Sequence, residues 1–159
     1  MSIQVSVKGT AELQKALRQY GAKAEKLVAA ALYREAEGVM AKSKEESPVG
    51  VDGNLRASGF VNLPETVNGK IRVELGYGGP SASYALYVHE GTRPHFPPVD
   101  ALKPWAKKFL GDESAAFAVA RKIARVGTKA TKFLERPLRQ RAAGMGERIA
   151  ARVRAGLGA

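Results

Sequence analysis

The sequence predicts an α+β fold: a long N-terminal helix packed on a small antiparallel sheet, with a helical C-terminal half. Two patterns support this prediction. Apolar residues recur at steps of three and four over residues 13–39, as on one face of a helix, whereas residues 70–77 alternate apolar and polar side chains, as in a strand. A chain of 159 residues suits one domain, so residues 1–159 are assigned to a single domain.

The N-terminal part predicts a strand and then the long helix. Residues 2–8 alternate, which indicates a short, half-buried strand. Thr10 is the expected N-cap of the helix, and Pro48 is expected to end it. A helix of that length would span about 50 Å. Gly21 and Gly38 are the positions where we expect it to bend.

The middle of the chain predicts a loop and two strands. Residues 47–58 are rich in turn-forming residues, which indicates a loop. Strands are predicted over residues 59–63 and 70–77. Asn68-Gly69, directly before the second strand, is a strong signal for a hairpin turn.

Three helices are predicted in the C-terminal half. The first covers residues 99–110 and the second residues 113–126, and a turn follows at 127–129. The last has Pro137 in its first turn and carries Leu138, Met145, Ile149 and Val153 along one side. Phe133-Leu134 is either a short strand or the beginning of that helix.

The composition of the chain excludes some kinds of functional site and favours some kinds of partner. The chain has no cysteine, which excludes disulfides and thiolate metal sites. Its formal net charge is +11, and residues 120–159 hold 11 basic residues against two acids. This excess predicts an acidic partner (nucleic acid, an anionic membrane or an acidic protein), and the alternative is a solvated basic face. No apolar run reaches the roughly 20 residues of a membrane span, and no secretory signal is visible, so we expect synthesis in a cytoplasm.

His89, Glu90 and His95 form the most suggestive chemical constellation. Zinc proteases place two histidines four residues apart on a helix, whereas here the spacing is six and Gly91 and Pro94 intervene. Glu90 or Asp100 would have to complete the ligand set. We therefore expect a structural turn here and no metal site.

Other catalytic patterns are also missing. The sequence has neither a Gly-x-Ser-x-Gly elbow nor a phosphate-binding Gly-Lys-Ser/Thr loop. The paired carboxylates at 45–46 and 112–113 suit helix ends. We expect no enzyme and no cofactor. For nucleic acid, the basic half lacks interleaved aromatic residues and any known helix-turn-helix or zinc finger, so DNA contacts would be sequence-blind and salt-sensitive.

Three segments carry a family resemblance. Residues 47–58 are similar to a "Pro-Val-Asp-Thr-Gly-x-Leu-Arg-x-Ser" loop, residues 84–93 to a "Tyr-Ala-x-Tyr-Val-Glu-x-Gly-Thr" signature, and residues 133–138 to a closing "Pro-Phe-Leu-Arg-Pro-Ala" element. Together and in this order they resemble a family of long-tailed phage proteins described as minor tail components, neck proteins or tail-completion proteins. The matching residues are expected to be structural: Pro48, Gly53, Leu55, Arg56, Ser58, Tyr84, Tyr87, Gly91 and Thr92.

The chain departs from the family pattern at three places. The first loop has extra residues around Gly50-Val51, and His89 stands where the family often has an acid, with Glu90 one place later. Residues 97–127 are interpreted as a helical insertion between the Gly-Thr turn and the closing element.

The resemblance implies a structural virion protein that forms a homo-oligomeric, sixfold ring at the head–tail junction. Its implied partners are connector or head-closure proteins, tail terminator or tail-tube proteins, and the genomic DNA in the channel, contacted without sequence specificity. The implied location is the virion, after assembly in the host cytoplasm. The predicted contact residues for DNA or a neighbouring ring are Arg121, Lys122, Arg125, Arg139, Arg148, Arg152 and Arg154. The alternative is a free DNA-binding or DNA-packaging accessory protein.

Overall fold

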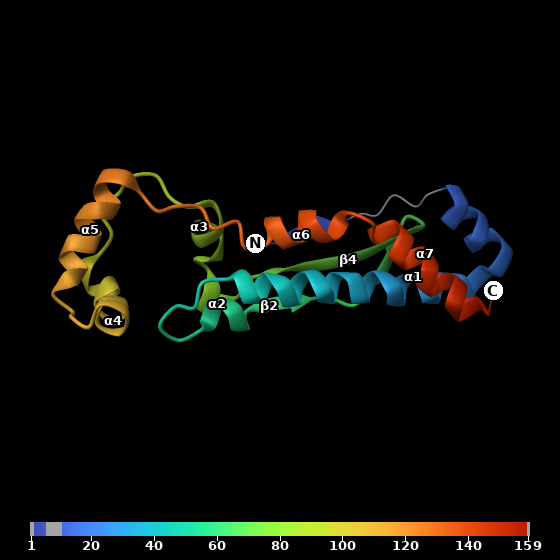
Figure 1. Ribbon diagram of the computed structural model, residues 1–159, viewed down its shortest axis with the longest axis horizontal. Coiled ribbons are helices and arrows are strands. Elements are labelled where there is room, and N and C mark those ends of the chain that lie inside the picture. The colour runs from blue at the N-terminus through green and yellow to red at the C-terminus, as the bar shows by residue number, and fades with distance from the viewer. Residues whose placement is uncertain (1, 6–10, 159) are drawn as a thin grey trace. The chain divides into compact units, whose positions relative to one another are not determined.

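The structure is a computed structural model that describes the backbone of residues 2–5 and 11–158 and the side chains of residues 21–158. The chain forms two compact units (Figure 1). The first unit comprises residues Met1–Glu46, Gly59–Tyr77 and Leu134–Ala159, and the second comprises Ser47–Ser58 and Gly78–Phe133. The prediction of one domain over residues 1–159 stays a prediction.

The long helix of the first unit, α1 (Ala11–Glu46), is broken at one residue. Gly21 has φ +55° and ψ −140°, a conformation that glycine tolerates and other residues avoid, so a shorter helix precedes the main one. The predicted bend at Gly21 is therefore confirmed, whereas Gly38 lies within regular helix. The expected N-cap, Thr10, lies outside the described residues.

The sheet is organised around β4 (Lys70–Tyr77), to which three strands pair antiparallel. They are β1 (Ser2–Val5), β2 (Gly59–Val61) and β3 (Glu65–Val67). Asn68 and Gly69 have φ +51° and +71° and connect the β3–β4 hairpin, as predicted from this dipeptide. The sequence pattern did not predict β3, which has only three residues.

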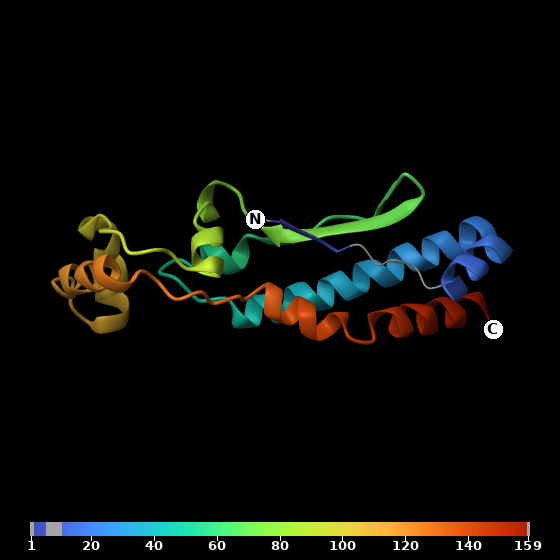
Figure 2. The ribbon, with the colours of Figure 1, turned by 90° about the horizontal axis from the view of Figure 1, so that it is seen from above.

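The main part of α1 lies between β4 on one side and the C-terminal helices on the other, as Figure 2 shows. Val28, Leu32 and Val39 of α1 are buried, as are Val73 and Leu75 of β4. The buried Tyr77 hydroxyl donates a hydrogen bond to Ser43 Oγ at 2.9 Å and so joins β4 to α1. The predicted packing of the long helix on the sheet is confirmed.

The prediction of a single last helix is wrong, because this segment forms two helices. They are α6 (Glu135–Ala142) and α7 (Met145–Leu157), separated by Gly144 at φ +69°. Leu134 directly precedes α6, and Pro137 lies in its first turn, as expected. Met145, Ile149 and Val153 are buried along one side of α7.

The second unit consists of short helices and connecting segments. They are α2 (Asn54–Ala57), the 3-10 helix η1 (Pro80–Ala82), α3 (Ala85–Glu90), α4 (Val99–Leu110) and α5 (Ala115–Val126). The last two pack on each other as the α4–α5 hairpin, which agrees with the helices predicted there. That residues 97–127 are an insertion stays a prediction. Within the described residues, no helix has both the length and the apolar character needed to cross a bilayer.

Candidate functional site

The loop over residues 47–58 contains a single turn of helix, α2, whose surroundings explain four of the predicted structural residues. Gly53 precedes α2 with φ +69°, a left-handed conformation that favours glycine. Leu55 is the buried side chain of the turn. Ser58 Oγ donates to the Leu55 carbonyl at 2.8 Å, which satisfies an orphan acceptor at the helix end.

Arg56 closes this loop on itself. Its Nη2 donates to the Ser47 carbonyl at 3.0 Å, and its Nε lies 3.5 Å from Ser47 Oγ. Arg56 therefore holds the two ends of the segment together, while Pro48 is exposed. These residues of the first family segment therefore make contacts within the segment itself, and their role in the family motif stays a prediction.

The second family segment ends in what we call the Gly–Thr clasp, formed by Gly91, Thr92, Gly127 and Thr128. Thr92 N–H donates to the Thr128 carbonyl and Thr128 N–H to the Thr92 carbonyl, both at 3.1 Å. The two hydroxyl oxygens are 3.0 Å apart, within hydrogen-bond distance. Two Gly-Thr pairs from distant parts of the sequence thus face each other as an isolated antiparallel bridge.

Only glycine fits at the two clasp positions. Gly91 (φ +75°, ψ 179°) and Gly127 (φ +71°, ψ −160°) adopt a backbone region that is essentially restricted to glycine. A Cβ atom at Gly91 would lie 2.4 Å from the Thr128 carbonyl oxygen, and one at Gly127 would lie 2.0 Å from that of Thr92. The expectation that Gly91 supplies a backbone angle other residues resist is met.

The chain after the clasp continues along the end of α3. Thr131 Oγ1 donates to the Val88 carbonyl at 2.8 Å, and Lys132 N–H donates to the His89 carbonyl at 3.1 Å. The buried His89 ring meets the Phe133 ring edge-on, with centroids 5.1 Å apart. Lys132 pairs with Glu90, and this hydrogen bond keeps the pKa of the Glu90 carboxyl below its ordinary value.

His89 and His95 lie in different environments. His89 is buried, whereas His95 is exposed, with Nδ1 2.9 Å from the Arg93 carbonyl oxygen. Among the described residues, His95 belongs to no group of three side chains close enough to share one metal ion. The structure therefore does not assemble His89, Glu90 and His95 into a ligand set.

The two tyrosines of the second family segment lie on the surface. Tyr84 is 40 % exposed and Tyr87 is 61 % exposed, while Ala85 and His89 are buried. These rings therefore do not anchor the segment to the core, and the buried side chains of α3 are Ala85 and His89.

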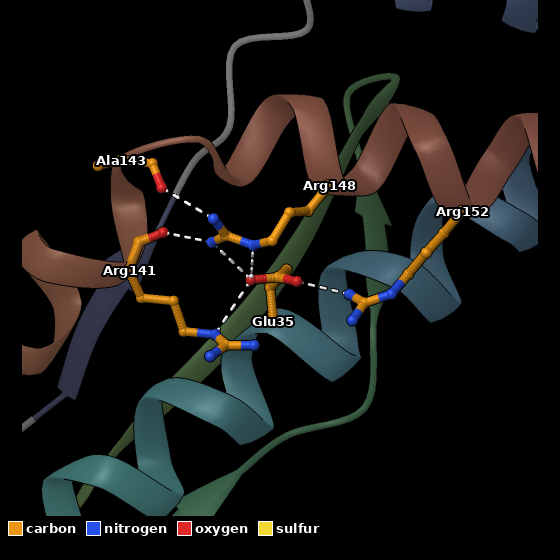
Figure 3. A network of polar contacts seen from close by, with 5 residues as sticks. All are labelled: Glu35, Arg141, Ala143, Arg148 and Arg152. Atoms are coloured by element: carbon orange, nitrogen blue, oxygen red, sulfur yellow. Dashed lines mark hydrogen bonds and ion pairs between the residues drawn. The ribbon is translucent and has the colours of Figure 1, made fainter.

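The strongest polar constellation in the first unit is the Glu35 cluster, which comprises Glu35, Arg141, Arg148 and Arg152 (Figure 3). Glu35 is fully buried on α1. Arg148 donates to its Oε2 from Nε at 3.1 Å and from Nη2 at 2.9 Å, and Arg152 Nη1 donates to its Oε1 at 2.5 Å. Arg141 Nε lies 3.0 Å from Oε2. One carboxylate thus joins α1 to both C-terminal helices.

Arg148 also holds the connection between α6 and α7. Its Nη1 donates to the Ala143 carbonyl at 2.8 Å and its Nη2 to the Arg141 carbonyl at 2.5 Å. Burial by itself would raise the pKa of Glu35, but the hydrogen bonds from Arg148 and Arg152 and the charge of Arg141 outweigh it, so the pKa lies below its ordinary value. Glu35 is therefore ionised at neutral pH.

The sequence contains a signal for the role of Glu35. Its position continues the apolar stripe of α1, between Leu32 and Val39, where an acid is out of place. Gly38 supplies room for one of its partners, because a Cβ atom there would lie 2.4 Å from Arg141 Cζ.

The predicted contact residues divide between the units. Arg121, Lys122 and Arg125 are exposed on α5 of the second unit. In the first unit, Arg139 pairs with Glu135 at 2.5 Å and Arg154 is exposed. Arg148 and Arg152 belong to the Glu35 cluster, so part of their charge is neutralised inside the fold. Their contact with DNA or a neighbouring ring stays a prediction.

Comparison with known proteins gives one match. The family described as "Bacteriophage HK97-gp10, putative tail-component" matches residues 11–91, slightly more than half of the chain. The matched range contains α1, the strands β2, β3 and β4, the 47–58 loop and α3 up to Gly91. It ends where the Gly–Thr clasp begins. No curated protein matches the chain, and no solved structure does.

Proposed function

The chain belongs to the HK97-gp10-like family of bacteriophage tail components, and from this premise we propose that it forms a homo-oligomeric ring at the head–tail junction of a long-tailed phage or prophage-derived particle. Membership confirms the resemblance predicted from the sequence and makes the chain a structural protein related to the phage tail. The family match is the observation that carries the proposal. The ring, its sixfold symmetry and its place in the neck are the proposed part.

Charge and surface chemistry support a position around the DNA channel. With 26 basic and 15 acidic residues, the chain suits the neighbourhood of a polyanion. Arg121, Lys122 and Arg125 make no ion pair with any described residue, so they are available to phosphates or to a partner. Phosphate contacts alone give binding without sequence specificity, which fits a channel through which the whole genome passes.

Electron microscopy and mass spectrometry of purified particles test the proposal. We expect the chain among the virion proteins in a low copy number that is a multiple of six, and ring-shaped assemblies of the purified protein in negative stain. Light scattering after gel filtration would give the mass of those assemblies. Particles that lack the chain would refute the proposed function.

The alternative is a free DNA-binding or packaging accessory protein, favoured by the α5 cations, which make no ion pair with the residues that the structure describes. Titration of DNA binding against salt separates the two functions. Tight binding by the monomer, with an affinity that falls steeply as salt rises, would favour the accessory protein. Weak binding by the monomer, together with incorporation into particles, would favour the ring.

A further inference from the structure

The α4–α5 hairpin buries only small side chains and exposes large ones. Its buried residues, among those the structure describes, are Ala106, Ala116 and Ala120. The hairpin and the segment leading into it expose aromatic side chains that are 37–56 % accessible, which together we call the aromatic face. Its members are Phe96, Trp105, Phe109 and Phe117. Two helices of 12 residues each are marginal in water without packing against something larger.

The rings of the aromatic face are already arranged in pairs. The centroids of Phe96 and Phe117 are 6.3 Å apart, and those of Trp105 and Phe109 are 5.4 Å apart. Aromatic side chains organised in this way are typical of the centre of protein interfaces, where they supply most of the binding energy. Outside the second unit, Leu63 is the one described large hydrophobic side chain that is comparably exposed.

The charged side chains around the aromatic face differ in their partners among the described residues. On α4, Lys103 pairs with Asp100 at 2.5 Å and Lys107 with Glu113 at 3.0 Å, while Lys108 Nζ donates to the Val51 carbonyl at 2.6 Å. The α5 helix has no acidic residue. Its cations Arg121, Lys122 and Arg125 are exposed and make no ion pair or hydrogen bond with the described residues.

We propose that the α4–α5 hairpin docks on an acidic, apolar-centred surface of another protein in the particle. The aromatic face would form the dry centre of this interface, and the three α5 cations would pair with carboxylates at its rim. The inference rests on the proposed function, because it requires the chain to be present in the particle. It adds the chemistry of a partner that the family match does not cover, since the hairpin lies beyond residue 91.

Charge disfavours a second copy of the hairpin, and the apolar centre disfavours DNA. In a symmetric contact, a second hairpin would bring the same three α5 cations to the rim, where like charges repel. Double-stranded DNA would satisfy the cations but not the apolar centre, because its bases are stacked and paired and offer no exposed face to Trp105 or Phe109. An acidic protein surface with an apolar centre would pair with the α5 cations and also cover the aromatic face.

Site-specific photo-crosslinking in assembled particles tests the inference. The full-length chain would carry p-benzoyl-phenylalanine at Phe117, or at Leu63 as the control on the first unit, in particles produced from the genome that encodes it. After irradiation, mass spectrometry would identify the attached peptide. We expect position 117, and not position 63, to yield a product with a different virion protein, in a segment where acids outnumber bases.

A charge-reversal series provides a second measurement. In Arg121→Glu/Lys122→Glu/Arg125→Glu we expect the yield of the position-117 product to fall roughly tenfold. The matched control is Lys23→Glu/Lys26→Glu/Lys70→Glu, which makes the same charge change at exposed residues of the first unit and should leave the yield unchanged. Circular dichroism would confirm that both variants fold.

The outcomes separate the inference from the proposed function. A position-117 product with a second copy of the chain, with DNA or with no molecule at all, in particles that contain the chain, overturns the inference alone. Equal loss of product in the two charge-reversal variants also overturns it, because the effect would then be a general one of net charge. Particles without the chain overturn the proposed function and the inference together.

Discussion

Thr92 and Thr128, 36 residues apart in the sequence, exchange both of their backbone hydrogen bonds and bring their hydroxyls within 3.0 Å of each other. The chain between them, which includes the α4–α5 hairpin, begins and ends at this one point of the second unit. An insertion between two residues that are paired in this way can be gained or lost without moving the chain on either side. The family match ends at Gly91, the residue directly before Thr92.

Removing the hairpin tests this view of the clasp. A variant in which residues 93–127 are replaced by Asn-Gly should fold, because two residues of this type suit the turn between a hydrogen-bonded antiparallel pair. We expect helical ellipticity to drop by the share of α4 and α5, and the remaining stability to stay within about 2 kcal/mol of the parent. Urea unfolding followed by circular dichroism measures both. A variant that exposes its core and lacks a cooperative transition would contradict the prediction.

The glycines of the clasp should resist substitution. Gly127→Ala places a Cβ atom 2.0 Å from the Thr92 carbonyl oxygen, in a backbone region that alanine avoids, and we expect a loss of about 3 kcal/mol or more. Gly111→Ala is the matched control. Gly111 has a similar φ of +77° but no atom within 4 Å of its Cβ position, so about 1 kcal/mol is expected. Equal losses in the two variants would mean that the close approach does not matter.

Neutralising Glu35 should loosen the C-terminal helices. In Glu35→Gln three guanidinium groups lose their common carboxylate, and we expect a loss of about 2 kcal/mol, since each arginine side chain is 36–41 % exposed and keeps part of its hydration. Glu37→Gln, at an exposed position of the same helix, should change stability by less than about 0.5 kcal/mol. Hydrogen exchange should show faster opening of α7 in the first variant only.

The same carboxylate should make stability depend on acid. The pKa of Glu35 in the folded chain lies below its ordinary value of 4.5, so its stabilisation is complete above that value and is lost as the pH falls through the lowered folded pKa. We therefore expect the parent to lose more stability than Glu35→Gln between about pH 6 and about pH 3. Thermal unfolding across this range measures the difference. Parallel pH profiles for the two proteins would show that Glu35 does not contribute.

Much of the fold was predictable because its signals are local. The bounds of α4 follow from its helical period and from Gly111, which ends the helix in a left-handed conformation. Asn68-Gly69 indicated the hairpin turn, and Gly21 the break in α1. The division between α6 and α7 was missed although Gly144 indicated it, because the apolar spacing continues across the break.

The candidate site was less predictable. Gly53, Leu55, Arg56, Ser58 and Gly91 have local structural roles in their segments, while their role as family-motif residues stays a prediction. The resemblance did not indicate that Tyr84 and Tyr87 would be exposed, because an aromatic residue next to a buried alanine has the same local pattern whether it packs inward or outward. The exposure of the aromatic rings on the α4–α5 hairpin could not be predicted for the same reason.

The sequence by itself determined where helices and turns begin and end, the basic character of the chain and its family, since all of these depend on residues near one another or on composition. Only the tertiary structure decided that Glu35 meets Arg148 and Arg152, which lie 113 and 117 positions away, and that Gly91-Thr92 faces Gly127-Thr128. Such pairs form because the fold brings distant segments together and leaves a buried charge or backbone group that must be satisfied. No local pattern specifies which distant residue will do so.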